Sequence, residues 1–541
     1  MAYDYKRQPY VTPPGITASE PRHPVAIIGA GPVGLAMAID LALHGVACVV
    51  LDDNDVVSIG SRGLCWAKRT LEIYDRLGVG QRITDKGVTW QVGRQFHGEA
   101  ELFNFDLLPE PGHKMPAFVN LQQYYVEDYL IDRARDFPDL IDLRFKNTVT
   151  GHQDQGDHVR LRIDTPDGPY EIDAHYLLAC DGAKSPTRAR MGLGFDGQSF
   201  EEQFLIADIE MHASPFGDTD VPERWFWFDP AFHPGKSALL HMQPDNIYRI
   251  DLQLAAGADP KAEAQPDRVM PRIKAMLGDK DFRLDWVSVY SFRCARLERF
   301  VHDRVIFVGD SAHVVSPFGA RGGNGGIQDV DNLGWKLAAI LNGDAPMALL
   351  ESYDSERGHA ADENILNSAR ATNFMTPKSP AEAEFRAETL RLARCEHFAR
   401  KLLNSGRLSL PASYAGMALQ TPSDAPVPPG AACPDAPLKD GDNNPVWLID
   451  LLRGFTLLGL GNVSLPTVEG ITRIGIDQTG DYPCFADPDG LASARYGCDR
   501  AYLIRPDGHV CASFTAPTRA GIAAARDRAL GQHITESESA A

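Results

Sequence analysis

Apolar runs of strand length alternate with a helical pattern near the start of the chain. Ala26–Ile28 and Ala47–Leu51 are short continuous apolar runs, and Leu35–His44 between them carries its apolar residues at helical spacing. Gly45 follows that helix as a stop signal. The pattern therefore predicts a complete β-α-β unit, with a further helix over Leu71–Leu77.

Two apolar runs farther along the chain are each followed by an acidic residue. Tyr176–Cys180 precedes Asp181, and Arg304–Val308 precedes Gly309 and Asp310. Both runs predict buried strands, and the second returns the chain to the parallel sheet.

The segment between those two runs has a different pattern. From about residue 195 to 295, polar and apolar positions alternate, as in Arg224–Phe228, Ser237–Met242 and Tyr248–Leu254. Such alternation predicts an antiparallel sheet inserted between the two strands. It should direct two of the four aromatic residues of Trp225–Phe228 to each face of that sheet.

After the last of these strands, the pattern is mainly helical from about residue 327 to 403, and then it changes. Ile327–Leu341 predicts an amphipathic helix, and Ser352–Leu403 has mainly helical patterning. The Pro-, Asp-, Gly- and Ala-rich stretch Thr421–Leu438 predicts a linker. Beyond it, four short strands and a last helix predict a small separate α/β domain: Thr456–Leu458, Ile471–Ile476, Ala501–Ile504, Val510–Phe514 and Arg519–Leu530.

Composition narrows the classes of function. The chain has 541 residues, of which 44% are hydrophobic, so it can bury two or three cores. Its formal net charge is -20 and Lys and Arg are not concentrated anywhere, so no nucleic-acid partner is expected. No run approaches the roughly 18 apolar residues of a membrane span, and residues 1–24 lack a signal-peptide pattern. We therefore expect a soluble protein without a membrane partner.

The nine cysteines are scattered, and no two form a C-x-x-C pair. The sequence therefore indicates neither a zinc site nor a dithiol redox motif, and no metal is expected. Because several of these cysteines lie inside apolar runs, they fit buried thiols in a reducing cytoplasm.

The first glycine run has the composition of a dinucleotide-binding turn. Gly29 permits a tight turn, Gly31 lets the backbone approach a pyrophosphate, and Gly34 lets the helix pack closely on the strand. The helix N-terminus would offer free N–H groups and a partial positive charge to phosphates. Asp52, at the end of the second strand, is placed to accept hydrogen bonds from ribose hydroxyls. The alternative is a purely structural glycine turn.

The segment from Asp181 to Arg188 has the pattern D-G-x-x-S-x-x-R. It is consistent with a surface turn after a strand. It is equally consistent with a cluster in which Asp181 and Arg188 brace a cofactor site.

The third strand ending favours a cofactor. Asp310 is able to hydrogen-bond a polyol such as the ribityl chain of a flavin. A helix expected to begin near Asn324–Ile327 would direct its positive end at a ring system, and reduced flavin is negatively charged near N1. The loop before it offers backbone that can lie flat against that ring, through Pro317, Gly319, Gly322, Gly323, Gly325 and Gly326. FAD, held at both ends, is therefore the predicted cofactor.

These three motifs, in this order, resemble those of the flavoprotein aromatic hydroxylases, which are single-component FAD-dependent monooxygenases with the p-hydroxybenzoate hydroxylase fold. The resemblance covers roughly residues 24–405, and the D-G-x-x-S-x-x-R segment matches the family motif at every defined position. It implies a Rossmann-like FAD-binding domain over residues 25–194 and 295–405, with a substrate-binding β-sheet domain inserted over residues 195–294.

The resemblance also implies cofactor contacts. Arg62 and Gln123 match a family arginine and glutamine near the cofactor, with Gln122 leaving the register of the glutamine open. Asp52 stands where the family usually has Glu. The ADP half of FAD would be held by Gly29, Gly31, Pro32, Val33, Gly34 and Asp52.

The remaining implied contacts concern the flavin half of the cofactor. Asp181 and Arg188 would serve both FAD and NAD(P)H, and Asp310 would bind the ribityl chain. The isoalloxazine would be lined by Pro317 and by the backbone of Gly322, Gly323 and Asn324, where the family often has Met in place of Gly323.

The C-terminal part resembles the thioredoxin-like domain of some members, such as phenol and 3-(3-hydroxyphenyl)propionate hydroxylases. We expect residues 1–24 to form a tail, 406–438 a linker and 439–541 this domain. Without a C-x-x-C pair the domain would have no thiol chemistry, so a role in assembly or stability is expected. The chain is compatible with a homodimer.

The resemblance implies a two-stage reaction. NADPH or NADH reduces FAD, the reduced flavin binds O2 as a C4a-hydroperoxide, and the outer oxygen is transferred to a small phenolic substrate. Arg249 would pair with a substrate carboxylate, and His241 or Tyr290 would relay the phenol proton. Each of these is equally consistent with a structural residue. The polar candidates on the inserted sheet are His241, Arg249, Asp251 and Tyr290.

Other functions stay open at this point. An NAD-dependent dehydrogenase would not need the strand that ends at Asp310. A flavin-dependent halogenase shares the fold, but the run Trp225–Pro230 lacks the Ile-Pro ending of the halogenase W-x-W-x-I-P motif. An NAD(P)H oxidase or a non-catalytic flavin-binding scaffold would keep every motif. Hydroxylated benzoates, phenylpropionates, simple phenols and polyketide aromatics all stay open as substrates.

Overall fold

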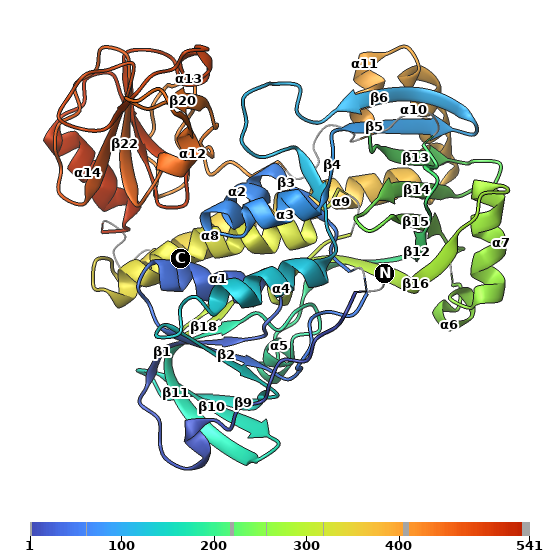
Figure 1. Ribbon diagram of the computed structural model, residues 1–541, viewed down its shortest axis with the longest axis horizontal. Coiled ribbons are helices and arrows are strands. Elements are labelled where there is room, and N and C mark those ends of the chain that lie inside the picture. The colour runs from blue at the N-terminus through green and yellow to red at the C-terminus, as the bar shows by residue number, and fades with distance from the viewer. Residues whose placement is uncertain are drawn as a thin grey trace.

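The computed structural model describes residues 3–60, 62–216, 221–255, 257–316, 319–403 and 410–532. Figure 1 shows a central unit of helices over a sheet, a large sheet to one side of it, and a small unit that contains the C-terminal strands. The protein therefore has a mixed α/β fold with several sheets. Among the helices in the described ranges, none is both long and apolar enough to cross a membrane.

The central unit is built on a mainly parallel sheet. The path runs β17-β18-β11-β1-β2-β8, and the five strands from β18 to β8 are parallel neighbours. An antiparallel extension, β9 and β10, continues from β11. This arrangement confirms the predicted β-α-β unit and the predicted return of Arg304–Val308 to the parallel sheet. The strands are β1 (His23–Ile28), β2 (Cys48–Asp52), β8 (Ile141–Phe145), β9 (Thr148–Asp154), β10 (Val159–Thr165), β11 (Gly168–Ala179), β17 (Val301–His302) and β18 (Val305–Phe307).

Helices cover the central sheet. Helix α1 is apolar on nearly every side and is buried from Gly34 to Ala42, between the sheet and helices α4 and α8. Figure 1 shows α1, α4 and α8 stacked over the sheet. The helices of the central unit are α1 (Pro32–Leu43), α2 (Lys68–Arg76), α3 (Gly80–Lys86), α4 (Gln123–Ala134), α5 (Pro186–Arg190), α8 (Gly322–Leu341) and α9 (Leu350–Met375), followed by α10 (Pro380–Ala393) and α11 (His397–Leu402).

Helix α8 begins at Gly322, earlier than the predicted start near Asn324–Ile327, so part of the predicted glycine loop is helical. Glycine is needed at Gly326 because the helix packs closely there: a Cβ would lie 2.8 Å from Val33 Cγ2 and 3.2 Å from Gly309 Cα. A Cβ at Gly323 would lie 3.3 Å from the Trp66 ring. These glycines serve close helix packing rather than loop flexibility, and that packing leaves no signal in local sequence propensity.

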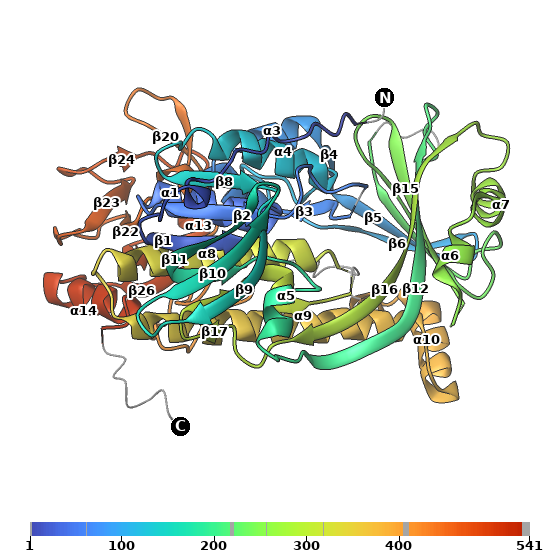
Figure 2. The same ribbon diagram turned by 90° about the horizontal axis from the view of Figure 1, so that it is seen from below.

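The second sheet has eight strands in the order β19-β16-β12-β15-β14-β13-β5-β6. Its core follows the predicted antiparallel insertion, but β5 and β6 come from residues 92–106, which the sequence assigned to the FAD-binding domain. Strand β5 joins β13 in parallel, and Figure 1 shows it beside β13. Figure 2 shows the long strands β12 and β16 reaching from the central unit into this sheet. The strands are β5 (Val92–His97), β6 (Ala100–Asp106), β12 (Asp196–Glu210), β13 (Arg224–Phe228), β14 (Ser237–Met242), β15 (Ile247–Gln253), β16 (Arg283–Arg296) and β19 (His313–Val314).

The two faces of this sheet have different neighbours. Trp225 and Trp227 belong to the apolar cluster that helix α7 (Pro266–Leu277) covers, after the short helix α6 (Pro260–Glu263). Phe226 and Phe228 belong to the opposite cluster, which includes residues of α9 and α10. The predicted alternation of these four aromatic residues is confirmed.

A small three-stranded sheet lies between the central unit and the large sheet. It is formed by β3 (Cys65–Ala67), β7 (Phe118–Asn120) and β4 (Val88–Trp90), in the order β3-β7-β4. Cys65 pairs with Asn120 across β3 and β7, and Asn120 Nδ2 donates to the Met242 carbonyl of β14 at 2.8 Å. The small sheet therefore connects the central unit to the large sheet, on the face that carries Phe226 and His241. This face is called the inner face below.

The C-terminal unit has a five-stranded sheet in the order β24-β23-β22-β25-β26. Its four predicted strands and last helix are confirmed. From residue 410 to the start of β20, the segment predicted as a linker is irregular but packed, because Tyr414 and Leu419 are buried. The elements are β20 (Pro437–Lys439), β21 (Pro445–Trp447), α12 (Leu448–Leu451), β22 (Phe455–Leu460), β23 (Ile471–Ile476), β24 (Cys484–Phe485), α13 (Leu491–Tyr496), β25 (Arg500–Ile504), β26 (Val510–Phe514) and α14 (Arg519–Ala529).

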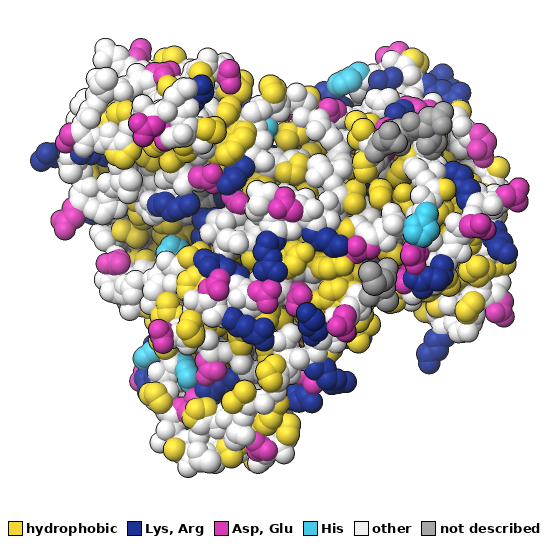
Figure 3. All heavy atoms as spheres, in the orientation of Figure 1, with side chains coloured by type: hydrophobic (Ala, Val, Ile, Leu, Met, Phe, Trp, Pro, Cys, Tyr) yellow, Lys and Arg dark blue, Asp and Glu magenta, His cyan; other side chains and the backbone are white. Residues whose placement is uncertain are grey.

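The C-terminal unit docks on α9 through a buried ion pair. Arg505 donates to both carboxylate oxygens of Glu356, at 2.6 and 3.0 Å, and its side chain is fully buried. Asp507 also accepts from Arg505, at 3.0 Å from Nε. On the face drawn in Figure 3, Lys and Arg are interspersed with Asp and Glu over all three units.

Candidate active site

The carboxyl ends of four parallel strands lie side by side at one edge of the parallel sheet. Strands β2, β1, β11 and β18 are consecutive neighbours, and their register aligns their carboxyl ends. Asp52 ends β2, Gly29 directly follows β1, and Asp181 and Asp310 follow β11 and β18 by two and three residues. The structure therefore brings the three sequence motifs to the edge where open α/β sheets bind ligands.

The glycine turn after β1 is shaped by close backbone contacts. Gly29 has φ +103°, and a Cβ there would lie 2.6 Å from the Cys180 carbonyl oxygen. A Cβ at Gly34 would lie 1.9 Å from the Gly29 carbonyl oxygen. Gly31 differs, because a Cβ there would meet no described atom within 4 Å. Helix α1 begins with Pro32 and Val33 beyond this open space and has no side-chain cap, so its N-terminus is available to an anion.

Asp52 connects the end of β2 to this turn. Its carboxylate accepts from the Ala30 N–H at 2.6 Å and from the Asn54 N–H at 2.8 Å. Burial raises the pKa of Asp52, and the two N–H bonds act against that rise. The carboxylate is only partly buried, and each oxygen retains a lone pair for a ribose hydroxyl.

Gln123 is the first residue of α4 and holds the loop that carries Arg62. Its Oε1 accepts from the Gly63 N–H at 3.0 Å, and its Nε2 donates to Ser58 Oγ at 2.9 Å and to Glu127 Oε1 at 2.7 Å. Arg62 itself is exposed. The adjacent Gln122 is buried, and its Oε1 has no hydrogen-bond partner among the described residues.

The Asp181–Arg188 segment is tied to the third strand ending. Asp181 Oδ2 accepts from the Thr187 N–H at 3.0 Å, whereas its buried Oδ1 has no partner in the described ranges. Arg188 donates to the carbonyls of Ser311 and Ala183 at 2.9 and 2.7 Å, and its guanidinium lies 3.7 Å from the centre of the Phe195 ring. Arg188 therefore braces this segment against the turn that carries Asp310.

Asp310 lies in the short 3-10 turn Gly309–Ser311 after β18. Its side chain is accessible to solvent, yet the surrounding protein removes enough hydration to raise its pKa. Asp329 of α8 adds to that rise, and His313 opposes it. Asp310 therefore combines solvent access with a partly dehydrated carboxylate.

A buried network fixes the turn that carries Asp310. Asp329 accepts from the Gly309 N–H at 2.9 Å, from His313 Nε2 at 2.7 Å and from Arg357 Nε at 2.6 Å. Burial alone would raise the pKa of Asp329, but His313 and Arg357 hold it below its ordinary value. Arg357 also donates to the Tyr414 hydroxyl at 2.8 Å. The turn is thus anchored to α8, α9 and the segment before the C-terminal unit.

The N-terminus of α8 is joined to strand β3. Asn324 donates to the Cys65 carbonyl at 2.8 Å and accepts from the Ala67 N–H at 2.9 Å. A Cβ at Gly323 would lie 3.3 Å from the Trp66 ring, and a Cβ at Gly322 would lie 3.7 Å from Val315 Cγ2. Pro317 lies outside the described residues. The side chain of Asn324 therefore positions β3, and the adjacent backbone stays available at the helix end.

The inner face of the large sheet carries the predicted polar residues. His241 of β14 pairs with Arg249 of β15, and Arg249 donates to Asp251 at 2.9 Å. Tyr290 of β16 lies farther along the same face and is partly buried. His241, Arg249 and Asp251 are thus brought together, whereas Tyr290 is separated from them by the width of β12.

Two of these groups have altered ionisation. Burial, with Arg249 and Arg224 nearby, holds the pKa of His241 well below its ordinary value, so the imidazole is neutral. Asp251 raises the pKa of Arg249 despite its burial. In the described part of the chain, no three His, Cys, Asp or Glu side chains are grouped as a metal ion requires.

The sequence reasoning missed several residues of the site. Asp329 and Arg357 carried no recognised motif, although they hold the turn at Gly309. Arg224 has the same strand parity as His241, and this alternation was a usable signal because the two residues pair across β13 and β14. Cys65 lies 3.9 Å from His241 Nδ1, a contact that depends on the small sheet and has no sequence signal.

These observations fit FAD. Because no described atom lies within 4 Å of a Cβ at Gly31, the α1 N-terminus has open space in front of it, as phosphate binding requires. Asp181 Oδ1, which has no partner among the described residues, and accessible Asp310 offer acceptors for cofactor hydroxyl or N–H groups. The helix end at Gly322–Asn324 and the strand β3 border the place where the ring system would lie.

Comparisons with known proteins agree with this geometry. The flavin-dependent monooxygenase of Mycobacteroides abscessus is 29% identical over 506 residues, which cover 90% of this chain and 96% of that protein. A probable NADH-specific resorcinol 4-hydroxylase of Rhodococcus jostii is 30% identical over 356 residues, or 64% of each chain. The crystal structure of the flavin-dependent monooxygenase PieE with FAD and substrate has the same fold, with a TM-score of 0.81 at 22% identity, covering 95% of this chain and 100% of that one. The profile of the FAD binding domain family matches residues 22–368, and the protein therefore belongs to that family.

Proposed function

We propose that this protein is an FAD-dependent monooxygenase that uses NAD(P)H and O2 to hydroxylate a phenolic aromatic ring. The observation that carries the proposal is the alignment of four strand ends, with Gly29, Asp52, Asp181 and Asp310, at one edge of the parallel sheet. The similarity to a flavin-dependent monooxygenase and to a probable NADH-specific resorcinol hydroxylase supports the same reaction class.

The cofactor contacts follow the geometry of that edge. The α1 N-terminus at Gly31–Gly34 would receive the pyrophosphate, Asp52 the adenosine ribose and Asp310 the ribityl chain. Arg62, Gln123, Asp181 and Arg188 would border the cofactor between these points. Bound FAD would supply hydride acceptance from NAD(P)H and the activation of O2.

The protein's own residues would hold the substrate and exclude water. The inner face of the large sheet, with His241, Arg249, Asp251 and Tyr290, would contact the phenol opposite the α8 N-terminus. Neutral His241 is suited to accept or donate a proton, since burial keeps it uncharged. Apolar neighbours on this face, such as Phe226 and Leu239, would keep water from the reacting ring.

We further propose that residues 439–541 form a thioredoxin-like domain without thiol chemistry. The parallel pair β22–β23 and the antiparallel pairs β22–β25 and β25–β26 support this assignment. The buried Arg505–Glu356 contact supports a stabilising role. We also propose a cytoplasmic location, because the nine unpaired cysteines agree with a reducing compartment. We propose that the enzyme forms homodimers.

Purification and turnover test the proposal. A yellow protein with absorbance near 450 nm is expected, and its NADH or NADPH oxidation should accelerate with one member of a panel of phenols, phenolic acids and polyketide aromatics. Product mass should rise by one oxygen atom. A colourless protein that binds no added FAD contradicts the proposal, as does a yellow protein whose NAD(P)H oxidation yields only H2O2 across the panel.

A further inference from the structure

On the inner face of the large sheet, the Arg224 guanidinium has no partner among the described residues. Arg224 is the first residue of β13 and pairs across the strands with His241 of β14. Within the described ranges, no oxygen accepts a hydrogen bond from its side chain, and no carboxylate forms an ion pair with it. Its surroundings remove hydration and lower the pKa of its guanidinium, although the side chain keeps some solvent contact.

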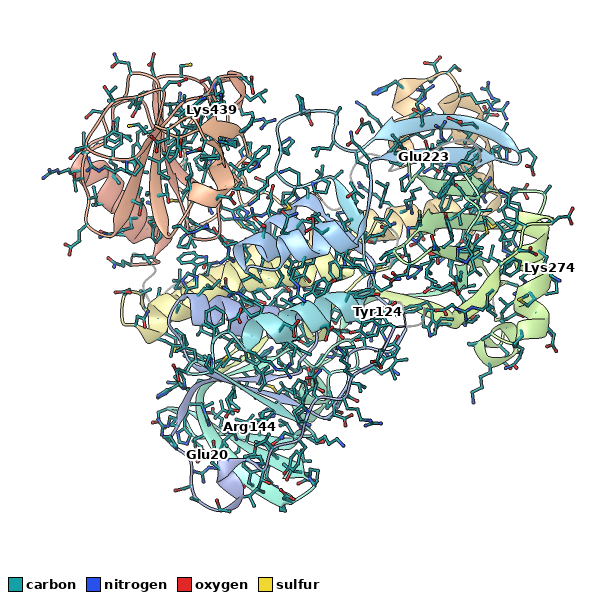
Figure 4. The ribbon with its side chains drawn as sticks, in the orientation of Figure 1. Glu20, Tyr124, Arg144, Glu223, Lys274 and Lys439 are labelled. Atoms are coloured by element: carbon teal, nitrogen blue, oxygen red, sulfur yellow. The ribbon has the colours of Figure 1, made fainter. Side chains whose placement is uncertain are left out.

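The nearby acidic groups are engaged elsewhere. Glu223, labelled in Figure 4 beside β5, accepts from Arg94 at 2.5 and 2.8 Å and from Trp225 Nε1 at 2.7 Å. Asp251 accepts from Arg249 at 2.9 Å. Burial raises the pKa of the Cys65 thiol to about 11, so that thiol is not an anion at neutral pH. Asp251 acts on the Arg224 guanidinium only through its charge, and in the described part of the chain no acidic group pairs with Arg224.

His241, beside Arg224, adds a second polar atom that has no partner in the described ranges. Its Nδ1 lies 3.5 Å from Asn120 Nδ2 and 3.9 Å from Cys65 Sγ, and both of those groups are donors. With Nδ1 as the acceptor, the proton of the neutral ring is on Nε2. His241 Nε2 is buried and has no hydrogen-bond partner among the described residues. Two donors on neighbouring strands thus lack an acceptor in the described part of the chain.

The position of this pair relates it to the cofactor end of the site. His241 contacts Cys65 of β3, and the Cys65 carbonyl accepts from Asn324 at the N-terminus of α8. The pair therefore lies across β3 from the place where the flavin ring is proposed. A poorly hydrated cation and a buried N–H are unfavourable unless an acceptor joins them.

We propose that Arg224 and His241 together bind a carboxylate group on the aromatic substrate. The guanidinium supplies charge and two parallel donors, and His241 Nε2 supplies a third donor. This inference rests on the proposed function, and it assigns anion recognition to Arg224 because Arg249 is already paired with Asp251. Substrates with an acidic ring substituent are therefore favoured over neutral phenols.

A bromide soak tests the anion site without substrate or turnover. Crystals of the protein in bromide, examined by anomalous scattering, should show a bromide ion at the Arg224 guanidinium. That peak should be absent in Arg224→Met and present in Arg283→Gln, a matched change of an exposed arginine on the same sheet. An Arg224 side chain bonded to a protein carboxylate, with no bromide at high salt, overturns the inference.

Matched probes test the ligand class. The holoenzyme should bind 3-hydroxybenzoate at least tenfold more tightly than 3-hydroxybenzamide by calorimetry, as should Arg283→Gln. Arg224→Met should remove the preference, and Arg224→Lys should restore part of it. An equal preference in wild type and Arg224→Met contradicts the inference, and if neither probe binds, the bromide result decides. Hydroxylation of neutral phenols without a bromide site would refute only the anion site, and a bromide site in a protein that binds no FAD would refute only the proposed function.

Discussion

The substitution Gly31→Ala separates cofactor binding from folding. Gly31 has φ -78° and ψ -177°, which alanine adopts readily, and an added Cβ meets no described atom within 4 Å. The unfolding free energy of the apoprotein should therefore change by less than about 1 kcal/mol. The added methyl group would occupy the space proposed for the pyrophosphate. Losing two charge-assisted hydrogen bonds of about 1.5 kcal/mol each would weaken FAD binding roughly 100-fold.

Titration of the apoprotein with FAD, followed by flavin fluorescence, measures this effect. Gly441→Ala is the matched control, because its Cβ also meets open space but lies in the C-terminal unit. Gly34→Ala gives the contrasting result, since its Cβ would lie 1.9 Å from the Gly29 carbonyl oxygen and should destabilise the apoprotein itself. A Gly31→Ala protein that binds FAD within twofold of wild type refutes the reasoning.

Three further substitutions test other parts of the account. Asp310→Asn removes an accessible charge and should weaken FAD binding roughly tenfold without lowering the melting temperature, so unchanged FAD affinity would count against its ribityl role. Arg505→Met leaves buried Asp507 without its bonded arginine and Glu356 with Lys336 as its remaining bonded cation, and it should lower the unfolding free energy measured in urea by about 3–5 kcal/mol. An unchanged urea midpoint would show that the Arg505–Glu356 pair is not needed for docking. Glu20 and Arg144, labelled in Figure 4, form a buried pair at 2.6 Å. Burial would raise the pKa of Glu20, but bonds from His23 and Arg144 lower it to about 2. Because this folded-state pKa lies below the unfolded value, wild type should exceed Glu20→Gln in stability by roughly 3 kcal/mol at pH 7. The difference should shrink as the pH falls below about 4.5, and a difference that stays constant down to pH 3 would contradict the assignment.

Much of the fold was predictable because its signals are local. The apolar runs of β1, β2, β11 and β18 are each followed closely by a glycine or an acidic residue, and the pattern alone predicted all four as strands and the return of β18 to the parallel sheet. Strands β5 and β6 were not assigned to the large sheet, because the pairing of β5 with β13 joins residues about 130 positions apart and depends on tertiary packing.

The candidate site was predictable in its cofactor half and less so in its substrate half. Glycines and acidic residues after strands carry a recognisable spacing, whereas the partners of a buried side chain do not. In the sequence, Arg249 and Arg224 look alike, because both are arginines in segments where polar and apolar residues alternate. Only the structure shows that Arg249 is paired with Asp251, and no such pair involves Arg224 among the described residues.

The most direct test of the account is a crystal structure of the protein with FAD. The pyrophosphate is expected at hydrogen-bond distance from the α1 N-terminus at Gly31–Gly34, and the ribityl chain at Asp310. FAD bound elsewhere, or bound with Asp310 remote from its ribityl chain, would contradict the central claim.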